Sequence, residues 1–421
     1  MGQLVGRTAL GGSSTPGDID SRYAWVRLTI AVLLGTLGGV GMWSVVVVLP
    51  SVQAEFGISR ADAAIGYTLT MIGFGCGNIV LGRLVDRFGI FQPLLGGITV
   101  LCLGYLATAH ATNIWQFAIA HGLLIGFLGS AISFGPLIAD TSLWFQKRRG
   151  LAVSVCACGS YLAGTVWPPL IQHGIAAYGW RATHVGIGIT CLVVMLPLAF
   201  ALRRRSPVLS VAASAAARSA RPPLPVSPNV LQTLLAIAGV GCCVAMSMPQ
   251  VHIVAYCADL NYGAARGAEM LSLMLGFGIV SRLASGFIAD RIGGLRTLLL
   301  GSFLQGAVLL LYVPFDGLMS LYVISALFGL VQGGIISSYA IIVREYFPPE
   351  EAGMRVGVVL TATLLGMALG GWLSGVIFDY AGSYRAAFVN GLLWNALNLS
   401  IVSVLIWRAG RVRGKLSAQP I

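Results

Sequence analysis

The chain has 421 residues, of which 57% are hydrophobic and only 10% are charged. A water-soluble protein of this length would need far more polar surface, so the composition excludes that class and indicates a protein that crosses a membrane several times. The formal net charge is +12, but the basic residues lie in short loops between apolar runs. They do not gather as on a nucleic-acid-binding face, so nucleic acid is not expected as a partner.

Apolar runs of about 20 residues, the length that crosses a bilayer as a helix, recur along the whole chain. We predict an all-α membrane protein with twelve transmembrane helices in two pseudo-symmetric six-helix halves. The predicted spans are 25–50, 62–82, 93–110, 115–138, 150–171, 182–202, 229–256, 267–288, 296–314, 318–343, 354–378 and 385–407.

Residues 203–228 interrupt this pattern with three arginines followed by alanine, serine and proline, which predicts a flexible cytoplasmic linker. The linker separates an N-terminal half, 1–202, from a C-terminal half, 229–421. Lysine and arginine favour one side of the membrane. The opposite side holds only Arg60, Arg181, Arg266 and Arg385, and Arg282 lies within a span. The positive-inside rule therefore predicts that both termini are cytoplasmic. Compact loops lead us to expect the inner membrane of a bacterium.

The two halves contain related motifs. The segment 82–89 (GRLVDRFG) follows the second span, and the segment 286–293 (GFIADRIG) follows the eighth, which places Asp86 and Asp290 204 residues apart. The same offset relates Arg181 in YGWRAT to Arg385 in GSYRAA. Two unrelated motifs at one offset predict that each half is one structural unit, as in transporters built from repeats around a central site.

The twelve predicted helices, the central basic linker and the motif at Gly82, Leu84, Asp86, Arg87 and Gly89 together resemble the major facilitator superfamily. Ile90 and Phe91 stand where that family usually has basic residues. The resemblance implies that the halves rock against each other and that the duplicated turns act as a conformational latch. The latch residues would be Gly82, Asp86, Arg87, Gly89, Asp290 and Arg291.

A narrower resemblance lies between the fourth and fifth spans. The segment 144–152 (WFQKRRGLA) followed by 159–164 (GSYLAG) is similar to a signature of monocarboxylate transporters, and 38–43 (GGVGMW) is loosely similar to their first-helix motif without its acidic residue. Arg282 aligns with the substrate arginine of that family, while Gly278 replaces its helix-eight aspartate. The lysine of the dicarboxylate-exchanging relatives is absent. The resemblance favours the branch of monocarboxylate porters and oxalate–formate exchangers.

Arg282 is the main candidate for binding substrate. An ionisable residue well inside a membrane helix is costly and marks a functional site, and a guanidinium binds carboxylate bidentately. Gly278 and Ser285 share its helix face and are expected to leave room for a ligand. The fourteen acidic residues are expected in loops, termini or helix ends, so no buried carboxylate is expected. The alternative is a structural arginine held by helix carbonyls or by a neighbouring acid.

Other polar and aromatic residues within the spans are weaker candidates. His252 follows Pro249 in the seventh span and could carry a proton, since histidine titrates nearest physiological pH; Tyr256 shares its face. The alternative is a histidine hydrogen-bonded near the external surface. The remaining substrate-binding candidates, whose alternative role is packing between helices, are Asn78, Trp43, His121, Tyr161 and Gln332.

The leading prediction is a secondary transporter of a small, monocarboxylate-like organic anion that works by alternating access, with protons as the candidate coupling ion. No nucleophile–base pair, Walker A loop or metal-ligand cluster is found in the sequence, so no enzyme activity, cofactor or metal is expected. Efflux of a neutral or amphipathic compound is the alternative, and a membrane sensor without transport is a remote one. The expected partners are the anion, protons and the lipid bilayer, and a monomer is expected.

Overall fold

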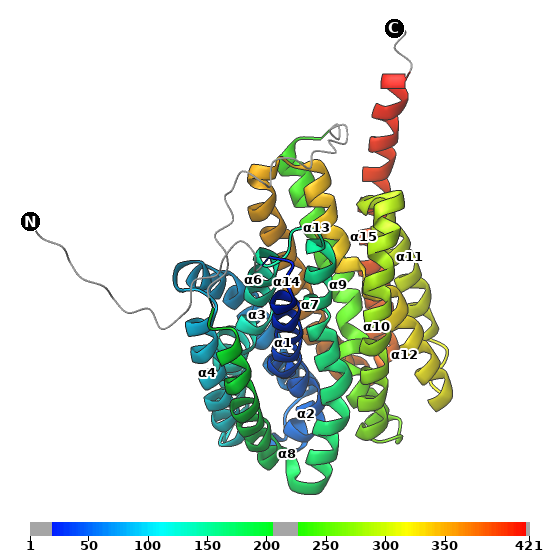
Figure 1. Ribbon diagram of the computed structural model, residues 1–421. Helices are drawn as coiled ribbons and strands as arrows, with labels where there is room; N and C mark the ends of the chain where they lie inside the picture. Colours follow the sequence, from blue (N-terminus) through cyan, green and yellow to red (C-terminus); the bar gives the residue numbers. More distant parts are fainter. Residues whose placement is uncertain (1–18, 205–225, 418–421) are drawn as a thin grey trace, which may run out of the picture.

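The computed structural model describes residues 19–204 and 226–417, and every regular element in these ranges is a helix (Figure 1). The N-terminal half contains α1 (Arg22–Gly38), α2 (Val40–Phe56), α3 (Arg60–Phe88), α4 (Phe91–Ala109), α5 (Ile114–Ile119), the π-helix η2 (Ala120–Ser130), the 3-10 helix η3 (Ala131–Ser133), α6 (Gly135–Leu143), α7 (Arg149–Ala157) and α8 (Gly159–Ala201). The C-terminal half contains α9 (Pro228–Asp259), α10 (Ala264–Ile292), α11 (Gly294–Leu311), α12 (Leu318–Gln332), α13 (Ile335–Tyr346), α14 (Pro349–Ala381) and α15 (Tyr384–Ser417).

Within these ranges, eleven helical segments are long and apolar enough to cross a membrane. The longest, Arg149–Ala201, contains Gly179 at φ 80° and ψ 162°, a conformation that no helix accommodates, so this segment is two spans joined by a turn. The prediction of twelve spans is confirmed. The predicted linker, 203–228, lies mostly outside the described residues, and the division of the chain at that point stays a prediction.

The two halves lie side by side: in Figure 1, α3 and α4 lie on one side of the bundle, and α11 and α12 lie on the other. Helix α3 packs against α14, and α8 packs against α10, so each half contributes one member to each contact. We call the end of the bundle opposite the described chain ends the distal end. It contains the helix ends near residues 55–62, 109–114, 176–182, 256–266, 312–318 and 379–385. The other end is the proximal end.

The repeat predicted from the sequence is visible in the backbone. Gly89 (φ 78°, ψ 169°) and Gly293 (φ 85°, ψ 163°) adopt the same left-handed conformation after α3 and α10. Their N–H groups donate to residues four positions earlier, at 2.7 Å and 2.8 Å. Gly57 and Asn261 likewise both have φ of 61° at the distal ends of α2 and α9. Residues 204 positions apart therefore occupy equivalent places in the two halves.

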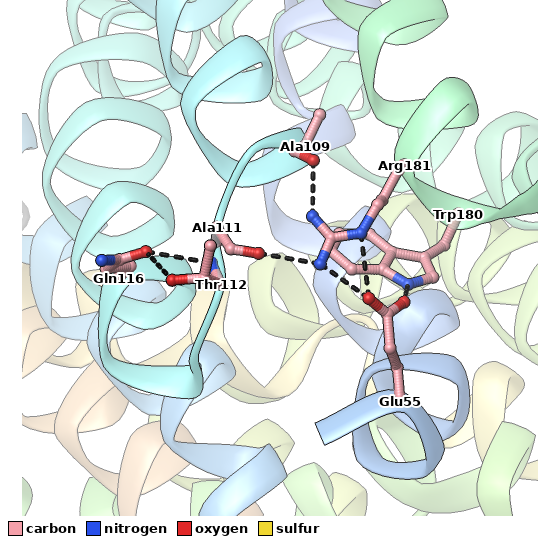
Figure 2. Close-up of polar contacts among 7 residues, drawn as sticks. All are labelled: Glu55, Ala109, Ala111, Thr112, Gln116, Trp180 and Arg181. Atoms are coloured by element: carbon pink, nitrogen blue, oxygen red, sulfur yellow. Dashed lines mark hydrogen bonds and ion pairs between the residues drawn. The ribbon is translucent and has the colours of Figure 1, made fainter.

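The repeated arginine, Arg181 in one half and Arg385 in the other, also makes similar contacts in each half. The guanidinium of Arg181 donates to the carboxylate of Glu55, at 2.6 Å and 3.0 Å, and to the carbonyls of Ala109 and Ala111, while the indole of Trp180 donates to the other carboxylate oxygen of Glu55 (Figure 2). Arg385 lies 3.5 Å from Asp316. In each half this arginine thus binds the loop that joins the third and fourth spans of the repeat.

Candidate substrate site

Arg282 lies well inside α10 and reaches across to the other half of the protein. Its Nη1 donates to the carbonyl of Ala157 at 3.0 Å, and its Nε lies 3.5 Å from the carbonyl of Gly333. Both carbonyls stand at breaks in their spans, between α7 and α8 and between α12 and α13. The carbonyl of Ala157 also accepts from the hydroxyl of Ser160 at 3.1 Å. Helix ends leave such carbonyls available to outside donors. Arg282 forms no ion pair with any acid of the described residues.

Tyr161 lies directly beneath this guanidinium. The charged group is 4.6 Å from the centroid of the Tyr161 ring, a distance at which an aromatic ring attracts a cation. The same ring occupies the space beside Gly278, where a Cβ atom would lie 2.5 Å from Cε1 of Tyr161. The expectation that Gly278 leaves room for a ligand is therefore wrong, since the absent side chain makes room for Tyr161. Ser285 turns its hydroxyl to the carbonyl of Arg282.

Trp43 completes a cluster of three predicted site residues that come from three helices. Its indole Nε1 donates to the carbonyl of Ser160 at 3.2 Å, and the ring packs against Gly164. Trp43 on α2 therefore packs against the stretch of α8 that holds Tyr161, whose ring contacts Arg282 on α10 of the other half. We call these three residues the arginine cluster.

Gln332 lies beside the arginine cluster. It is the last residue of α12, next to Gly333, and it is fully buried. Its Oε1 accepts a hydrogen bond of 2.6 Å from Nε2 of Gln250. Its own Nε2 is buried and has no hydrogen-bond partner in the structure. The side-chain amide of Gln332 therefore has a free N–H donor, and it adjoins Gly333, whose carbonyl contacts Arg282.

His252 and Tyr256 lie near the distal end, apart from the arginine cluster. Nε2 of His252 lies 2.8 Å from the carbonyl of Gly371, which can only accept, so Nε2 carries the proton. Nδ1 then accepts from the hydroxyl of Tyr384 at 3.1 Å. The ring of Tyr256 packs 5.3 Å from that of Tyr384. His252 is thus fully hydrogen-bonded between α9, α14 and α15.

The two remaining candidates connect helices of the N-terminal half. His121 is fully buried, 3.0 Å from the hydroxyl of Thr70, and its ring is 6.1 Å from that of His184. His184 was not among the predicted site residues, although a histidine within an apolar run indicates a functional site. Asn78 donates to the carbonyl of Phe74 and accepts from the N–H of Gly135 at 2.8 Å, where α6 begins.

One carboxylate is buried, contrary to the expectation from the sequence. Asp140, on α6, is only 7% exposed, and its Oδ2 accepts from Nε and Nη2 of Arg27 at 3.1 Å and 2.9 Å. The guanidinium of Arg27 also lies 4.5 Å from the ring of Trp144. Asp140 stands one turn before its helix ends, so its place in the sequence suggested exposure, whereas its burial comes from packing against α1.

The predicted latch residues lie at the proximal ends of α3 and α10. Gly82 and Gly89 are half-buried there, whereas the side chains of Asp86, Arg87, Asp290 and Arg291 are all exposed. In the described parts of the chain, none of these four charged residues takes part in an ion pair. The duplicated turns are therefore present and do not join the two halves in this conformation.

The distal ends of the halves, in contrast, are joined by charged groups. Nη2 of Arg60, at the start of α3, lies 3.0 Å and 3.1 Å from the two carboxylate oxygens of Asp259 on α9. The carboxylate of Asp379 on α14 accepts from the backbone N–H groups of Arg60 and Ala61 at 2.9 Å and 2.8 Å. A carboxylate at a helix N-terminus satisfies free N–H groups and the helix dipole.

Comparison with solved structures supports this architecture. The nucleoside transporter NupG superimposes with a TM-score of 0.68 at 13% identity and covers 91% of this chain and 99% of its own. A bacterial homologue of the human lysosomal transporter Spinster, in an inward-facing and unoccupied conformation, gives a TM-score of 0.64 at 13% identity over 93% of this chain and 96% of its own. At this identity the similarity establishes the fold.

Sequence comparison finds transporters as well. Monocarboxylate transporter 13 of Bos taurus is 26% identical over 384 residues, which are 88% of this chain and 86% of that protein. The agnestins efflux protein AgnL12 of Paecilomyces divaricatus is 24% identical over 328 residues, 76% of this chain and 72% of its own. The family model for the Major Facilitator Superfamily matches residues 31–339 and 296–420. With its twelve spans and its duplicated turns, the chain belongs to the Major Facilitator Superfamily.

Proposed function

We propose that this protein is a secondary active transporter of a small organic anion and that Arg282 binds the anion. The observation that carries the proposal is a permanently charged guanidinium in the middle of a span with no acidic partner among the described residues. Its Nη2 makes no hydrogen bond to the residues that the structure describes. A substrate carboxylate would supply the missing negative charge, and Tyr161 and Trp43 would flank it.

Contacts between the halves support movement by alternating access. Hydrogen bonds and ion pairs between the halves run from the distal end, at Arg60, to the level of Arg282. Proximal to Arg282, none is found among the side chains that the structure describes, which exclude 349–350 and 410–417. The exposed turns at Asp86 and Asp290 belong to the proximal end. We infer a conformation that is closed at the distal end, and a cycle in which the proximal latch engages as the distal contacts break.

The second candidate function is efflux of a neutral or amphipathic compound. It is favoured by the two carbonyls that hold Arg282, because these could satisfy the guanidinium as a structural element. The similarity to AgnL12 is consistent with it. The two candidates differ in whether a negative charge on the ligand is needed for binding.

We further propose protons as the coupling ion, with His252 as the residue that would carry them. We also propose that both chain termini face the cytoplasm, which makes the distal end the outer face of the membrane, and that the protein works as a monomer. The uneven distribution of lysine and arginine supports this orientation. Each of the four distal arginines is paired with an acid, so the distal end contributes little net positive charge.

The test is uptake of a panel of radiolabelled monocarboxylates into proteoliposomes, with and without a pH gradient. Arg282→Ala should abolish uptake, and Arg282→Lys should reduce it strongly, because lysine lacks the planar bidentate geometry. In detergent, a transported carboxylate should raise the unfolding temperature of the wild type but not that of Arg282→Ala. Carboxylate transport by Arg282→Ala at the wild-type rate would overturn the anion site, and stabilisation by neutral amphipathic compounds alone would favour the efflux function.

A further inference from the structure

Glu55 and Asp259 are counterparts in the repeat, since they stand 204 residues apart in the last turns of α2 and α9. Gly57 and Asn261, which follow them, have the same positive φ. The bonds from the Ile58 N–H to the Gln53 carbonyl and from the Tyr262 N–H to the Cys257 carbonyl are also equivalent. The two carboxylates therefore project from equivalent positions in the last turns of α2 and α9.

Their partners differ. In the N-terminal half, Glu55 binds Arg181 of the same half (Figure 2). The counterpart of Arg181 is Arg385, but Asp259 binds Arg60 of the other half instead. The position 204 residues after Arg60 is Ala264, so this arginine has no counterpart in the repeat. The C-terminal half thus has a counterpart of each member of the Glu55–Arg181 pair, namely Asp259 and Arg385, and does not pair them in this conformation.

We propose that Asp259 exchanges partners during the transport cycle. It binds Arg60 while the distal ends are closed and binds Arg385 when the halves separate, which forms in the C-terminal half the counterpart of the Glu55–Arg181 pair seen in the N-terminal half. This inference rests on the alternating-access part of the proposed function and needs no particular substrate.

The surroundings of Asp259 support the exchange. Arg385 follows Tyr384, whose ring packs 5.3 Å from that of Tyr256, one turn before Asp259 on α9. Helices α9 and α15 belong to one half and pack against each other, so both partners stay close when the halves rock. In the closed state Arg385 is 3.5 Å from Asp316, with both side chains more than half exposed, and such a pair is weak and easily released.

The exchange also explains how the distal end can open without leaving the carboxylate of Asp259 unpaired. Arg60 is buried, with its guanidinium 4.9 Å from the ring of Phe378 and 5.9 Å from that of Tyr384. Breaking its ion pair with Asp259 would leave a half-buried carboxylate uncompensated, and losing one partner of such a pair is strongly unfavourable. A second arginine within the same half removes that penalty, so the open state becomes accessible.

The test measures the distance between the distal ends by electron–electron double resonance. Spin labels replace Tyr178 in one half and Met319 in the other, which are 78% and 76% exposed. Cys76, the exposed cysteine of the described chain, is replaced by serine. Arg60→Gln and Asp259→Asn should each increase the population with the longer distance, by about fivefold or more. The charge-reversed double variant Arg60→Asp with Asp259→Arg should restore the shorter distance, which would show that the loss of this ion pair causes the change in the single variants.

Arg385→Gln distinguishes partner exchange from a simple distal gate. In the Arg60→Gln background it should lower the long-distance population, because the open state loses its ion pair. In the Asp259→Asn background it should change nothing. Arg266→Gln removes one distal positive charge whose partner, Glu269, lies on the same helix, and it should leave the distances unchanged in both backgrounds.

Partner exchange is overturned if Arg385→Gln leaves the long-distance population in the Arg60→Gln background unchanged. It is also overturned if Arg385→Gln changes that population by the same amount in the Asp259→Asn background. These distances are measured without substrate. They therefore test the exchange independently of carboxylate uptake. A failure of carboxylate uptake would overturn the anion site and would not contradict the exchange at the distal end.

Discussion

The guanidinium of Arg282 lies 4.6 Å from the centre of the Tyr161 ring, although the two residues belong to opposite halves of the chain. The contact makes the candidate substrate site part of the interface that must change as the halves move. A ligand that binds Arg282 is therefore placed where it can influence the relative position of α8 and α10.

Tyr161 should contribute through its ring rather than through its hydroxyl. Tyr161→Phe keeps the cation–π contact, so KM for carboxylate uptake should stay within about twofold of the wild type. Tyr161→Ala removes an interaction worth about 0.5–2 kcal/mol, which corresponds to an increase of about 2- to 30-fold in KM. Uptake kinetics in proteoliposomes check this, and equal effects of the two variants would contradict a role for the ring.

Gly278→Ala should disturb the arginine cluster from the side of α10. The added Cβ would lie 2.5 Å from Tyr161, so the ring must move from beneath the guanidinium. Gly276→Ala is the matched control on the same helix, because its Cβ position meets only Thr165, at the ordinary contact distances of 3.5 Å and 3.6 Å. We expect carboxylate uptake to fall strongly in the first variant and to stay near the wild-type rate in the second. Similar rates for both would show that the ring position is unimportant.

The Arg27–Asp140 pair should stabilise the fold without taking part in substrate binding. Asp140→Ala leaves a buried guanidinium unpaired and should cost about 3–5 kcal/mol of stability. Replacing both residues, with Arg27→Met and Asp140→Leu, should recover most of that loss. Thermal unfolding in detergent measures both effects. A single variant as stable as the wild type would contradict the burial seen here.

Asp86 should affect turnover and not stability. Its side chain is exposed and forms no ion pair with the described residues in this conformation, so Asp86→Asn should change the free energy of unfolding by less than about 0.5 kcal/mol. If the turn latches the opposite conformation, the variant should populate the distal-closed state more and transport more slowly. Asp62→Asn, at the other end of α3, is the control. Unaltered turnover in Asp86→Asn would count against the latch.

The architecture could be predicted because its signals are local. Run lengths identified the spans, and the motifs around Asp86 and Asp290 and around Arg181 and Arg385 revealed the repeat, whose backbone geometry the structure confirms. Turn signals of this kind act over a few residues, and a membrane leaves few alternatives to a helix.

The surroundings of each side chain could not be predicted in the same way. The space at Gly278 belongs to Tyr161, about 117 residues earlier in the chain, and no local pattern assigns it. Asp140 is buried by packing of α1 and not by its position in α6. Asp259 and Arg385 are the counterparts of the paired residues Glu55 and Arg181, yet the structure pairs Asp259 with Arg60 across the interface. Tertiary contacts between helices decide these partners.

The two carbonyls that hold Arg282 have a consequence for the energetics of the cycle. Neutral acceptors leave the arginine's charge uncompensated, so the empty carrier moves with one excess positive charge at mid-membrane, whereas the carrier loaded with a monovalent carboxylate is electroneutral there. The membrane voltage acts on the moving charge, at about 2.3 kcal/mol per charge for each 100 mV crossed. If the anion crosses without a proton, the voltage should therefore govern the return of the empty carrier and not the passage of the substrate.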